Sequence, residues 1–383
     1  YHVLSALKRA GVSEVIFVVK EFKDQIINYF DNGKRFGLKI KYVEQDNLRG
    51  TAHAVTCAAE DITDDFIVIH GDLIFEHDIM EDLASMKGEN IVIGARVENP
   101  GDYGVILFEN GKVREISEKP KKFRGDEFVN SGIFLFESSI IDLFVDRVVR
   151  ENQCDIPQFI NRAVRNRDAE IRLLPLEATY HDIGHPWELL AANEFVLSKI
   201  EHKIEGEIEP GVIIKGDVII EKGSIITGQS YIKGPVYIGK NCEIGPNCFI
   251  RDNVALGDGV KIGRSVEVKN SIILAGTKAE HLAYIGDSII GEKCNFGAGT
   301  KLANLRFDDK PVKMNIRGEK VSSGRRKMGA IIGDNTKTGV NACFMPGVKA
   351  GPNSIIGAGV ILSSDAPPDR RIILKQEYII EDL

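Results

Sequence analysis

Two hydrophobic patterns divide the chain near residue 205. Before that point, apolar runs of strand length alternate with segments of helix length, which is typical of a mainly parallel sheet covered by helices. The predicted strands are 14–19, 39–43, 66–70 and 91–95, the predicted helices include 1–10 and 52–59, and 105–108 with 113–117 form a predicted hairpin. The first half is therefore predicted to be an open, Rossmann-like α/β domain.

Beyond residue 205 an aliphatic residue recurs every six positions. The series comprises Ile208, Ile214, Ile220, Ile226, Ile232, Ile238, Ile244, Ile250, Leu256, Ile262, Val268 and Leu274. It slips around 276–282, resumes at Tyr284, pauses over the polar, basic segment 306–328 and returns from Ile332 to Leu362. This period matches neither helix nor strand, but it fits a triangular solenoid with one short strand and one turn on each side. The pattern predicts about seven coils.

Length and composition agree with two domains, 1–205 and 206–383, because 383 residues exceed what one core usually supports. A net charge of −7 provides no basic surface, so we expect no nucleic-acid partner. No apolar run is long enough for a membrane span, so we expect no membrane partner either. The six cysteines form no C-x-x-C pair and the first residues do not read as a signal peptide, so we expect a reduced, cytoplasmic protein.

A glycine turn leads into the predicted helix 52–59. Backbone N–H groups after Gly50 and Thr51 can face a base or a phosphate, while Gln45 offers a paired donor and acceptor. The alternative is an ordinary Gly-Thr helix cap.

Two aspartates are candidate metal ligands. Asp72 follows the apolar strand 66–70 at its carboxyl end, where open α/β sheets bind ligands, and Asp182 is the natural second carboxylate. The alternative for both is helix capping, since Pro186 suits a first helical turn.

The order of these motifs resembles the sugar-1-phosphate nucleotidyltransferase family. The set is Gln45, Gly50-Thr51, Gly71-Asp72, Asp102-Tyr103-Gly104, Glu118-Lys119-Pro120, Asn130-Ser131-Gly132 and Asp182. The resemblance implies nucleotide contacts from Gln45, Gly50, Thr51 and Gly71, sugar contacts from Gly104, Glu118 and Asn130, a phosphate contact from Lys119, and Mg²⁺ held by Asp72 and Asp182. That family opens with a strand and a G-x-G-T-R loop followed by a Pro-Lys pair, whereas Tyr1 corresponds to the next helix. We therefore expect the natural protein to have an N-terminal segment before Tyr1, and expect no nucleotidyl transfer without it.

The six-residue rhythm resembles the left-handed parallel β-helix of hexapeptide-repeat acyltransferases, in which trimers are usual and active sites lie between subunits. His281 lies where the rhythm slips, and a histidine there can act as a general base, although a structural or solvated role is the alternative. Arg251 and Lys269 are 18 residues apart, so both can project from one face of the prism. With Tyr284, Asn295, Ala298 and Asn304 following, the set is similar to the acetyltransferase domain of bifunctional N-acetylglucosamine-1-phosphate uridylyltransferases.

By that resemblance His281 deprotonates the amine of an aminosugar phosphate. Arg251, Lys269, Tyr284 and Asn295 would bind the sugar phosphate, and Ala298, Asn304 and Ala358 would line the acetyl-CoA groove. The segment 304–308 and the run Arg325, Arg326 and Lys327 look closer to archaeal members than to bacterial ones. The run either meets CoA phosphates or lies in a solvated loop, and the tail after Asp365 has no assignment.

Together these features predict a cytoplasmic, homotrimeric, bifunctional enzyme of UDP-N-acetylhexosamine synthesis. Its β-helix would move an acetyl group from acetyl-CoA to glucosamine 1-phosphate or galactosamine 1-phosphate. Its α/β domain would move a nucleotidyl group from UTP or dTTP to the sugar 1-phosphate, with Mg²⁺, and release pyrophosphate. The alternatives are a nucleotidyltransferase with a scaffolding β-helix, or a non-catalytic assembly subunit.

Overall fold

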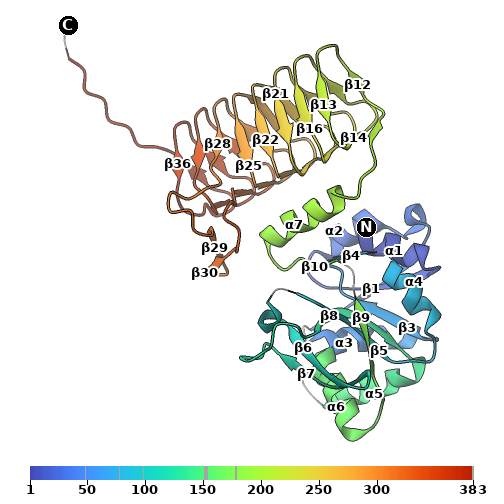
Figure 1. Cartoon of the computed structure of the whole chain (residues 1–383). Helices are drawn as coiled ribbons and strands as arrows, with labels where there is room; N and C mark the ends of the chain where they lie inside the picture. The colour runs from blue at the N-terminus through green and yellow to red at the C-terminus, as the bar shows by residue number, and fades with distance from the viewer. Residues whose placement is uncertain (48, 77, 98, 151–153, 177–178, 382–383) are drawn as a thin grey trace. The chain divides into compact units, whose positions relative to one another are not determined.

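A computed structural model describes residues 1–47, 49–76, 78–97, 99–150, 154–176 and 179–381. The chain divides into two compact units, Tyr1–Asp182 and Ile183–Leu383, which are the α/β part and the β-helical part of Figure 1. Of the described helices, none has both the length and the apolarity that a membrane crossing requires.

The first unit alternates helices and strands. Its longer helices are α1 (His2–Arg9), α2 (Lys23–Phe30), α3 (Thr51–Cys57), α4 (Asp78–Ser85), α5 (Ile141–Arg150) and α6 (Ile156–Asn166). Its strands are β1 (Glu14–Val19), β2 (Lys39–Glu44), β3 (Phe66–Ile69), β4 (Leu73–Phe75), β5 (Ile91–Ala95), β6 (Gly104–Glu109), β7 (Lys112–Glu118), β8 (Val129–Phe136), β9 (Arg172–Leu176) and β10 (Tyr180–Asp182). The predicted strands, helices and hairpin are confirmed, with ends shifted by a residue or two.

The central sheet of this unit has the order β3-β8-β5-β9-β7-β6, and the pairs β1–β2 and β4–β10 lie outside it. Among the described strand pairs of this first unit, only β1–β2 and β5–β9 are parallel, so the prediction of a mainly parallel sheet in this unit is wrong. Strands β6 and β7 are joined by the short turn Asn110-Gly111, and such a turn closes only an antiparallel pair.

Strand β5 shows how this sheet is covered on both faces. Side chains alternate along a strand, so Ile91 and Ile93 pack with α1 and α4, whereas Val92 packs on the other face with α5 and α6. All three are 0–1% exposed. Burial on both faces explains why the strand is apolar throughout.

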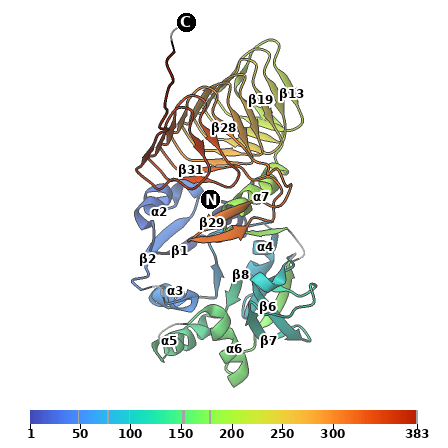
Figure 2. The ribbon, with the colours of Figure 1, turned by 90° about the vertical axis from the view of Figure 1, so that its left-hand side faces the viewer.

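The second unit is a parallel β-helix whose stacked coils are visible in Figure 2. Sheet one consists of β11 (Lys203–Ile204), β14 (Val218–Ile220), β17 (Val236–Ile238), β20 (Val254–Leu256), β23 (Ile272–Ile273), β26 (Ile289–Ile290), β31 (Ile331–Ile332) and β34 (Lys349–Ala350). Sheet two consists of β12 (Glu207–Ile208), β15 (Ile225–Ile226), β18 (Glu243–Ile244), β21 (Lys261–Arg264), β24 (Lys278–His281), β27 (Asn295–Phe296), β32 (Lys337–Thr338), β35 (Ile355–Ile356) and β37 (Arg371–Ile372). Sheet three consists of β13 (Ile213–Lys215), β16 (Tyr231–Lys233), β19 (Phe249–Arg251), β22 (Glu267–Lys269), β25 (Tyr284–Gly286), β28 (Lys301–Leu302), β33 (Cys343–Phe344) and β36 (Ile361–Leu362).

The β-helix is longer than predicted. Its sheets have 8, 9 and 8 strands, because β11 and β37 extend it beyond the aliphatic series that suggested about seven coils. The interior positions also slip earlier than predicted. Ile273 is fully buried and Leu274 is 41% exposed, and Ile285 rather than Tyr284 points inward. Consequently Lys269 pairs with Gly286, one residue short of the regular repeat that pairs Arg251 with Lys269.

A helix and a hairpin cover one side of the β-helix (Figure 1). Trp187 and Leu190 of α7 (Pro186–Leu197) form a buried cluster with Val312, Met314 and Met328 around the hairpin β29 (Lys313–Ile316) and β30 (Glu319–Ser322). This packing places α7 in the second unit, although the sequence pattern suggested a domain limit near 205.

Candidate functional sites

The predicted nucleotide motif forms one connected turn at the start of α3. Gln45 follows β2 and is 8% exposed, and its Nε2 donates to the backbone oxygen of Gly50 at 3.1 Å. Gly50 has φ of 97°, and a Cβ there would come within 2.4 Å of the backbone oxygen of Cys154. Thr51 N donates to Asp155 Oδ1 at 2.9 Å. The alternative prediction was that Gly50 and Thr51 cap helix α3. In the structure the Asp155 side chain caps it instead, by accepting from Thr51 N.

The two predicted metal ligands lie side by side in the backbone. Strands β4 and β10 are antiparallel and pair Asp182 with Leu73, the residue after Asp72. Tyr180, on the same strand as Asp182, donates its hydroxyl to Ser131 O at 2.8 Å. Burial raises the pKa of Tyr180, and the charges of Asp182 and Asp72 add to the effect. The pairing of β4 with β10 thus brings two carboxylates to neighbouring backbone positions, and carboxylate oxygens are the ligands that Mg²⁺ prefers.

The predicted sugar contacts meet where the β6–β7 hairpin opens. Gly104 pairs with Glu118, and a Cβ on Gly104 would come within 2.5 Å of Glu118 Oε1. Lys119 N donates to Tyr103 O at 3.0 Å. Partial burial raises the pKa of Glu118, and the charge of Asp155 raises it further while Lys119 opposes. Glu118 is therefore near the Asp155 that caps the nucleotide turn.

Of two further predicted contacts, Asn130 lies within β8 and Gly71 follows β3. Asn130 Oδ1 accepts from Gly132 N at 3.1 Å, and a Cβ on Gly132, whose φ is 78°, would come within 2.6 Å of His70 Nδ1. No atom lies within 4 Å of a Cβ built on Gly71, which leaves open space beside Asp72.

In the β-helix, Arg251 and Lys269 pair directly across successive strands of sheet three, as the spacing predicted. Arg251 donates to Glu267 Oε1 from Nε at 3.0 Å and from Nη2 at 2.9 Å. Burial opposes the charge of Arg251, but hydrogen bonds to Glu267 and Asp252 raise its pKa overall. The two basic side chains therefore lie in one row, Arg251 held by Glu267 and Lys269 by Asp287, which is an arrangement suited to a phosphate.

Asp287 connects Lys269, a predicted sugar-phosphate residue, with Asn304, a predicted acetyl-CoA residue, and the sequence reasoning did not assign it. Its carboxylate is 2% to 3% exposed and accepts from Asn270 Nδ2 at 2.8 Å, from Asn304 Nδ2 at 2.5 Å and from Lys269 Nζ at 3.3 Å. Asn304 also donates to Tyr284 Oη at 3.1 Å. The sequence feature that could have indicated Asp287 is its spacing of 17 residues, one shortened coil, from Asn270. Both residues lie at turns where φ is positive.

His281 lies before β25, whereas Asp287 lies directly after it. It ends β24, is exposed, and pairs with Arg264 of the preceding coil. Backbone bonds from Gly299 N to His281 O and from Asn341 N to Ala298 O show that His281 and Ala298 share one corner of the prism. Ala358 continues this corner, since Gly359 N donates to Val340 O.

Two predicted residues lie apart from their expected groups. Asn295 is on sheet two, where it pairs with Lys278. Asn304, predicted to face acetyl-CoA, is joined to Tyr284 and Asp287 instead of to the corner of Ala298. In the basic run, Arg325 forms an ion pair with Glu194 of α7, and Arg326 pairs with Asp309.

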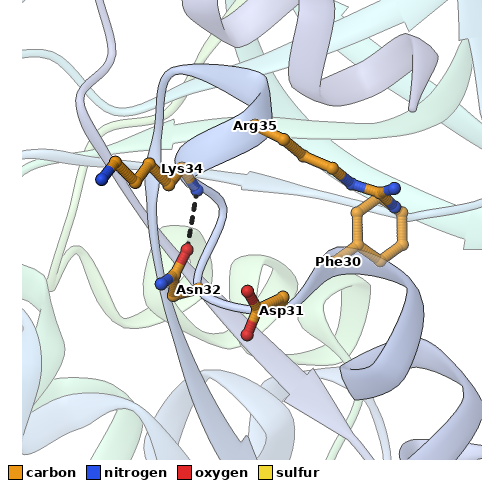
Figure 3. A pocket seen from close by; sticks show the side chains of 5 residues that line it. All are labelled: Phe30, Asp31, Asn32, Lys34 and Arg35. Carbon is orange, nitrogen blue, oxygen red and sulfur yellow. Dashed lines mark hydrogen bonds between the residues drawn. The ribbon is translucent and has the colours of Figure 1, made fainter.

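An open pocket follows α2 and contains none of the predicted residues. It is lined by Phe30, Asp31, Asn32, Lys34 and Arg35, and Lys34 N donates to Asn32 Oδ1 at 3.0 Å (Figure 3). Among the described residues there is no group of three or more His, Cys, Asp or Glu side chains that could hold a metal ion by itself. A metal at Asp72 and Asp182 would take its remaining ligands from a substrate or from water.

The fold and the two sites define a nucleotidyltransferase domain followed by a hexapeptide-repeat β-helix. Residues 1–199 match the family described as nucleotidyl transferase, 232–337 match a GMPPB C-terminal domain, and 329–364 match the hexapeptide repeat of succinyl-transferase.

The whole chain has relatives with the same two parts. It is 41% identical to the bifunctional protein GlmU of Methanococcus aeolicus, over 97% of this chain and 88% of the relative. It is 40% identical to the GlmU of Methanocaldococcus jannaschii over 97% and 89%. It is 37% identical to a bifunctional sugar-1-phosphate nucleotidylyltransferase/acetyltransferase of Sulfurisphaera tokodaii over 94% and 88%. The chain belongs to the family of bifunctional GlmU proteins, and the prediction of a transferase with a nucleotidyltransferase and an acetyltransferase domain is confirmed.

Proposed function

We propose that this protein makes a UDP- or dTDP-linked N-acetylhexosamine in two steps, in the cytoplasm and as a homotrimer. The β-helix acetylates glucosamine 1-phosphate or galactosamine 1-phosphate with acetyl-CoA. The α/β unit then joins the product to a nucleotidyl group from UTP or dTTP. The observation that carries the proposal is the pairing of Arg251 with Lys269 on sheet three, beside a buried carboxylate that links Lys269 to Asn304. Asn304 in turn contacts Tyr284 of β25, and His281 ends the preceding strand, β24.

In the acetyl transfer, Arg251 and Lys269 bind the sugar phosphate and Tyr284 with Asn295 orients the sugar. His281 takes a proton from the 2-amino group as the nitrogen of the sugar amine attacks the thioester carbonyl. The C–S bond then breaks, and the CoA thiolate leaves as the thiol by taking that proton from His281. An exposed corner with the small residues Ala298 and Ala358 leaves room for the extended acetyl-CoA. Asn304, which donates to Tyr284 and Asp287, supports the sugar-phosphate side of the site.

In the nucleotidyl transfer, a phosphate oxygen of the sugar attacks the α-phosphorus and pyrophosphate leaves. Gln45, Gly50, Thr51 and Gly71 position the nucleotide, and Gly104, Glu118, Lys119 and Asn130 position the sugar phosphate. Asp72 and Asp182 would hold Mg²⁺, which neutralises phosphate charge when bound. The paired strands that bring these carboxylates together support this assignment.

The test is His281→Ala, with His202→Ala as the matched control, because His202 is also exposed but lies outside the site. Free CoA is measured with each aminosugar phosphate, and pyrophosphate release is measured with UTP and dTTP. We expect His281→Ala to lower acetyl transfer by about 100-fold or more and to leave pyrophosphate release unchanged. Undiminished acetyl transfer would refute the role of His281. No CoA release by the unmodified protein, with pyrophosphate still produced, would leave a nucleotidyltransferase with a scaffolding β-helix.

A further inference from the structure

A buried histidine contacts the side chain of Gln45, and the proposed mechanism does not use it. His53 lies on α3 and is 8% exposed, as is Gln45. Gln45 Nε2 is 3.0 Å from His53 Nδ1 and 3.1 Å from the backbone oxygen of Gly50. One amide nitrogen therefore meets two partners.

These two partners fix the orientation of the amide. A backbone carbonyl can only accept, so the amide atom that faces Gly50 must be the NH₂ nitrogen. Its second hydrogen then points to His53, so His53 Nδ1 must be an unprotonated acceptor and the ring is neutral with its hydrogen on Nε2. With both amide hydrogens used, Oε1 is the part of the Gln45 amide that remains for a ligand.

We propose that His53 is a positioning residue for base selection, which locks the Gln45 amide so that Oε1 faces the nucleotide base. The inference rests on the proposed nucleotidyl transfer, in which Gln45 contacts the nucleotide. An oxygen at this place accepts the N3–H that uracil and thymine share. Cytosine presents a lone pair at N3, so an acceptor that cannot rotate disfavours CTP.

The surroundings of His53 keep the ring neutral. Burial lowers the pKa of His53 and the charge of Arg49 lowers it further, while the backbone of Asn47 and the charge of Asp46 oppose this. Cys57 also faces the ring: its Sγ is 4.0 Å from His53 Nε2, and burial raises the pKa of its thiol. In a protonated ring, the hydrogen on His53 Nδ1 would face a hydrogen on Gln45 Nε2. The repulsion between them would break this contact and allow the Gln45 amide to rotate.

Two substitutions separate positioning from packing. His53→Asn places an amide oxygen near the position of Nδ1 and keeps an acceptor, whereas His53→Phe keeps a planar ring without one. The dissociation constants of UTP and CTP are measured by calorimetry on the full chain with Mg²⁺, and thermal unfolding confirms that each variant is folded. We expect the preference for UTP over CTP to survive in His53→Asn and to fall about tenfold in His53→Phe, as for one lost hydrogen bond.

A preference that is unchanged in His53→Phe, or reduced equally in both variants, would overturn the inference while UTP binding keeps the nucleotidyltransferase assignment intact. Binding of neither nucleotide by the unmodified chain would overturn both. The pH profile gives an independent readout. UTP affinity should fall in acid, below the ordinary titration range of histidine, in the unmodified chain but not in His53→Asn. A parallel fall in both would contradict a role for ring protonation.

Discussion

Asn304 and Asp287 link two successive coils of the β-helix through a buried hydrogen bond, although the insertion that contains β29 and β30 begins just after Asn304. Asp287 also accepts from Lys269 and Asn270, so one carboxylate holds three side chains from neighbouring turns. A buried charge of this kind is tolerated only when it is paired and hydrogen-bonded. Asp287 therefore couples the shape of the coil to the position of the proposed phosphate-binding lysine.

Replacing Asp287 with Asn should disturb acetyl transfer selectively. The neutral amide would leave Lys269 without its partner and would set an NH₂ group against the amides of Asn270 or Asn304, a conflict that costs about 1–3 kcal/mol. We expect the KM for the aminosugar phosphate to rise about tenfold or more, with pyrophosphate release unchanged. Steady-state kinetics of both reactions on the same preparation measure this.

Asp258→Asn is the matched control, because Asp258 also accepts hydrogen bonds at a β-helix turn, from Lys240 N at 2.8 Å, but is exposed and away from the site. It should leave both reactions unchanged. Equal losses in Asp258→Asn and Asp287→Asn would show that any weakened turn impairs the enzyme, and would contradict a specific role for Asp287.

Gly286 is required by the close approach of two site residues. A Cβ at this position would come within 2.6 Å of both Asn304 Nδ2 and Tyr284 Oη. Gly286→Ala should therefore separate Tyr284 from Asn304 and lower kcat/KM for acetyl transfer by about tenfold or more. Gly228→Ala is the control, since its nearest atom would be 3.5 Å away. Unchanged acetyl transfer in Gly286→Ala would show that the Tyr284–Asn304 contact is dispensable.

The sequence predicted the sheets of the β-helix better than its network of buried contacts. The six-residue repeat can be recognised from the aliphatic residues of the sequence alone. The pairing of Arg251 with Lys269 then follows, because the two residues are one complete coil of 18 residues apart. The shortened steps near Ile273 and Ile285 were misplaced, because Leu274 and Tyr284 are also apolar and only packing decides which neighbour points inward. Asp287 was missed for a related reason: its three partners meet only once the coils are stacked.

In the α/β unit, the motif order indicated the function but could not give the strand directions. Asp72 and Asp182 are far apart in the chain, and only the pairing of β4 with β10 shows that they are neighbours. Likewise Asp155, which caps α3 from a distant segment, has no local sequence signal that connects it with Thr51. Long-range pairings of this kind depend on the whole fold.

Asp182→Asn should weaken the metal dependence of nucleotidyl transfer. Removing one of two carboxylates lowers the negative charge that attracts Mg²⁺, so the Mg²⁺ concentration for half-maximal pyrophosphate release should rise about tenfold or more. Acetyl transfer should stay unchanged. Asp64→Asn, a substitution of a carboxylate that is 77% exposed, serves as the control. An unchanged Mg²⁺ dependence in Asp182→Asn would remove this residue from the proposed metal site.

Glu118 should make nucleotidyl transfer sensitive to mild acid. Partial burial and the charge of Asp155 raise its pKa, so the carboxylate that we propose accepts sugar hydroxyls becomes protonated above the ordinary range of glutamate, which is centred at about 4.3. The KM for the sugar 1-phosphate should therefore increase as the pH falls through this raised pKa. The effect of Glu118 on the free energy of unfolding has the opposite sign. Because its pKa is higher in the folded than in the unfolded protein, protonated Glu118 stabilises the fold below the unfolded pKa, and this contribution is lost as the pH rises through the folded pKa.

Glu118→Gln cannot titrate, so its KM should be higher than that of the unmodified protein at neutral pH and flat in acid. Glu115 is exposed and lies on the same strand, so Glu115→Gln should retain the rise of the KM in acid. Pyrophosphate release measured across the pH series with both variants distinguishes the two carboxylates. An acid-dependent rise that persists in Glu118→Gln would assign the titration to another group and would leave Glu118 without a part in sugar binding.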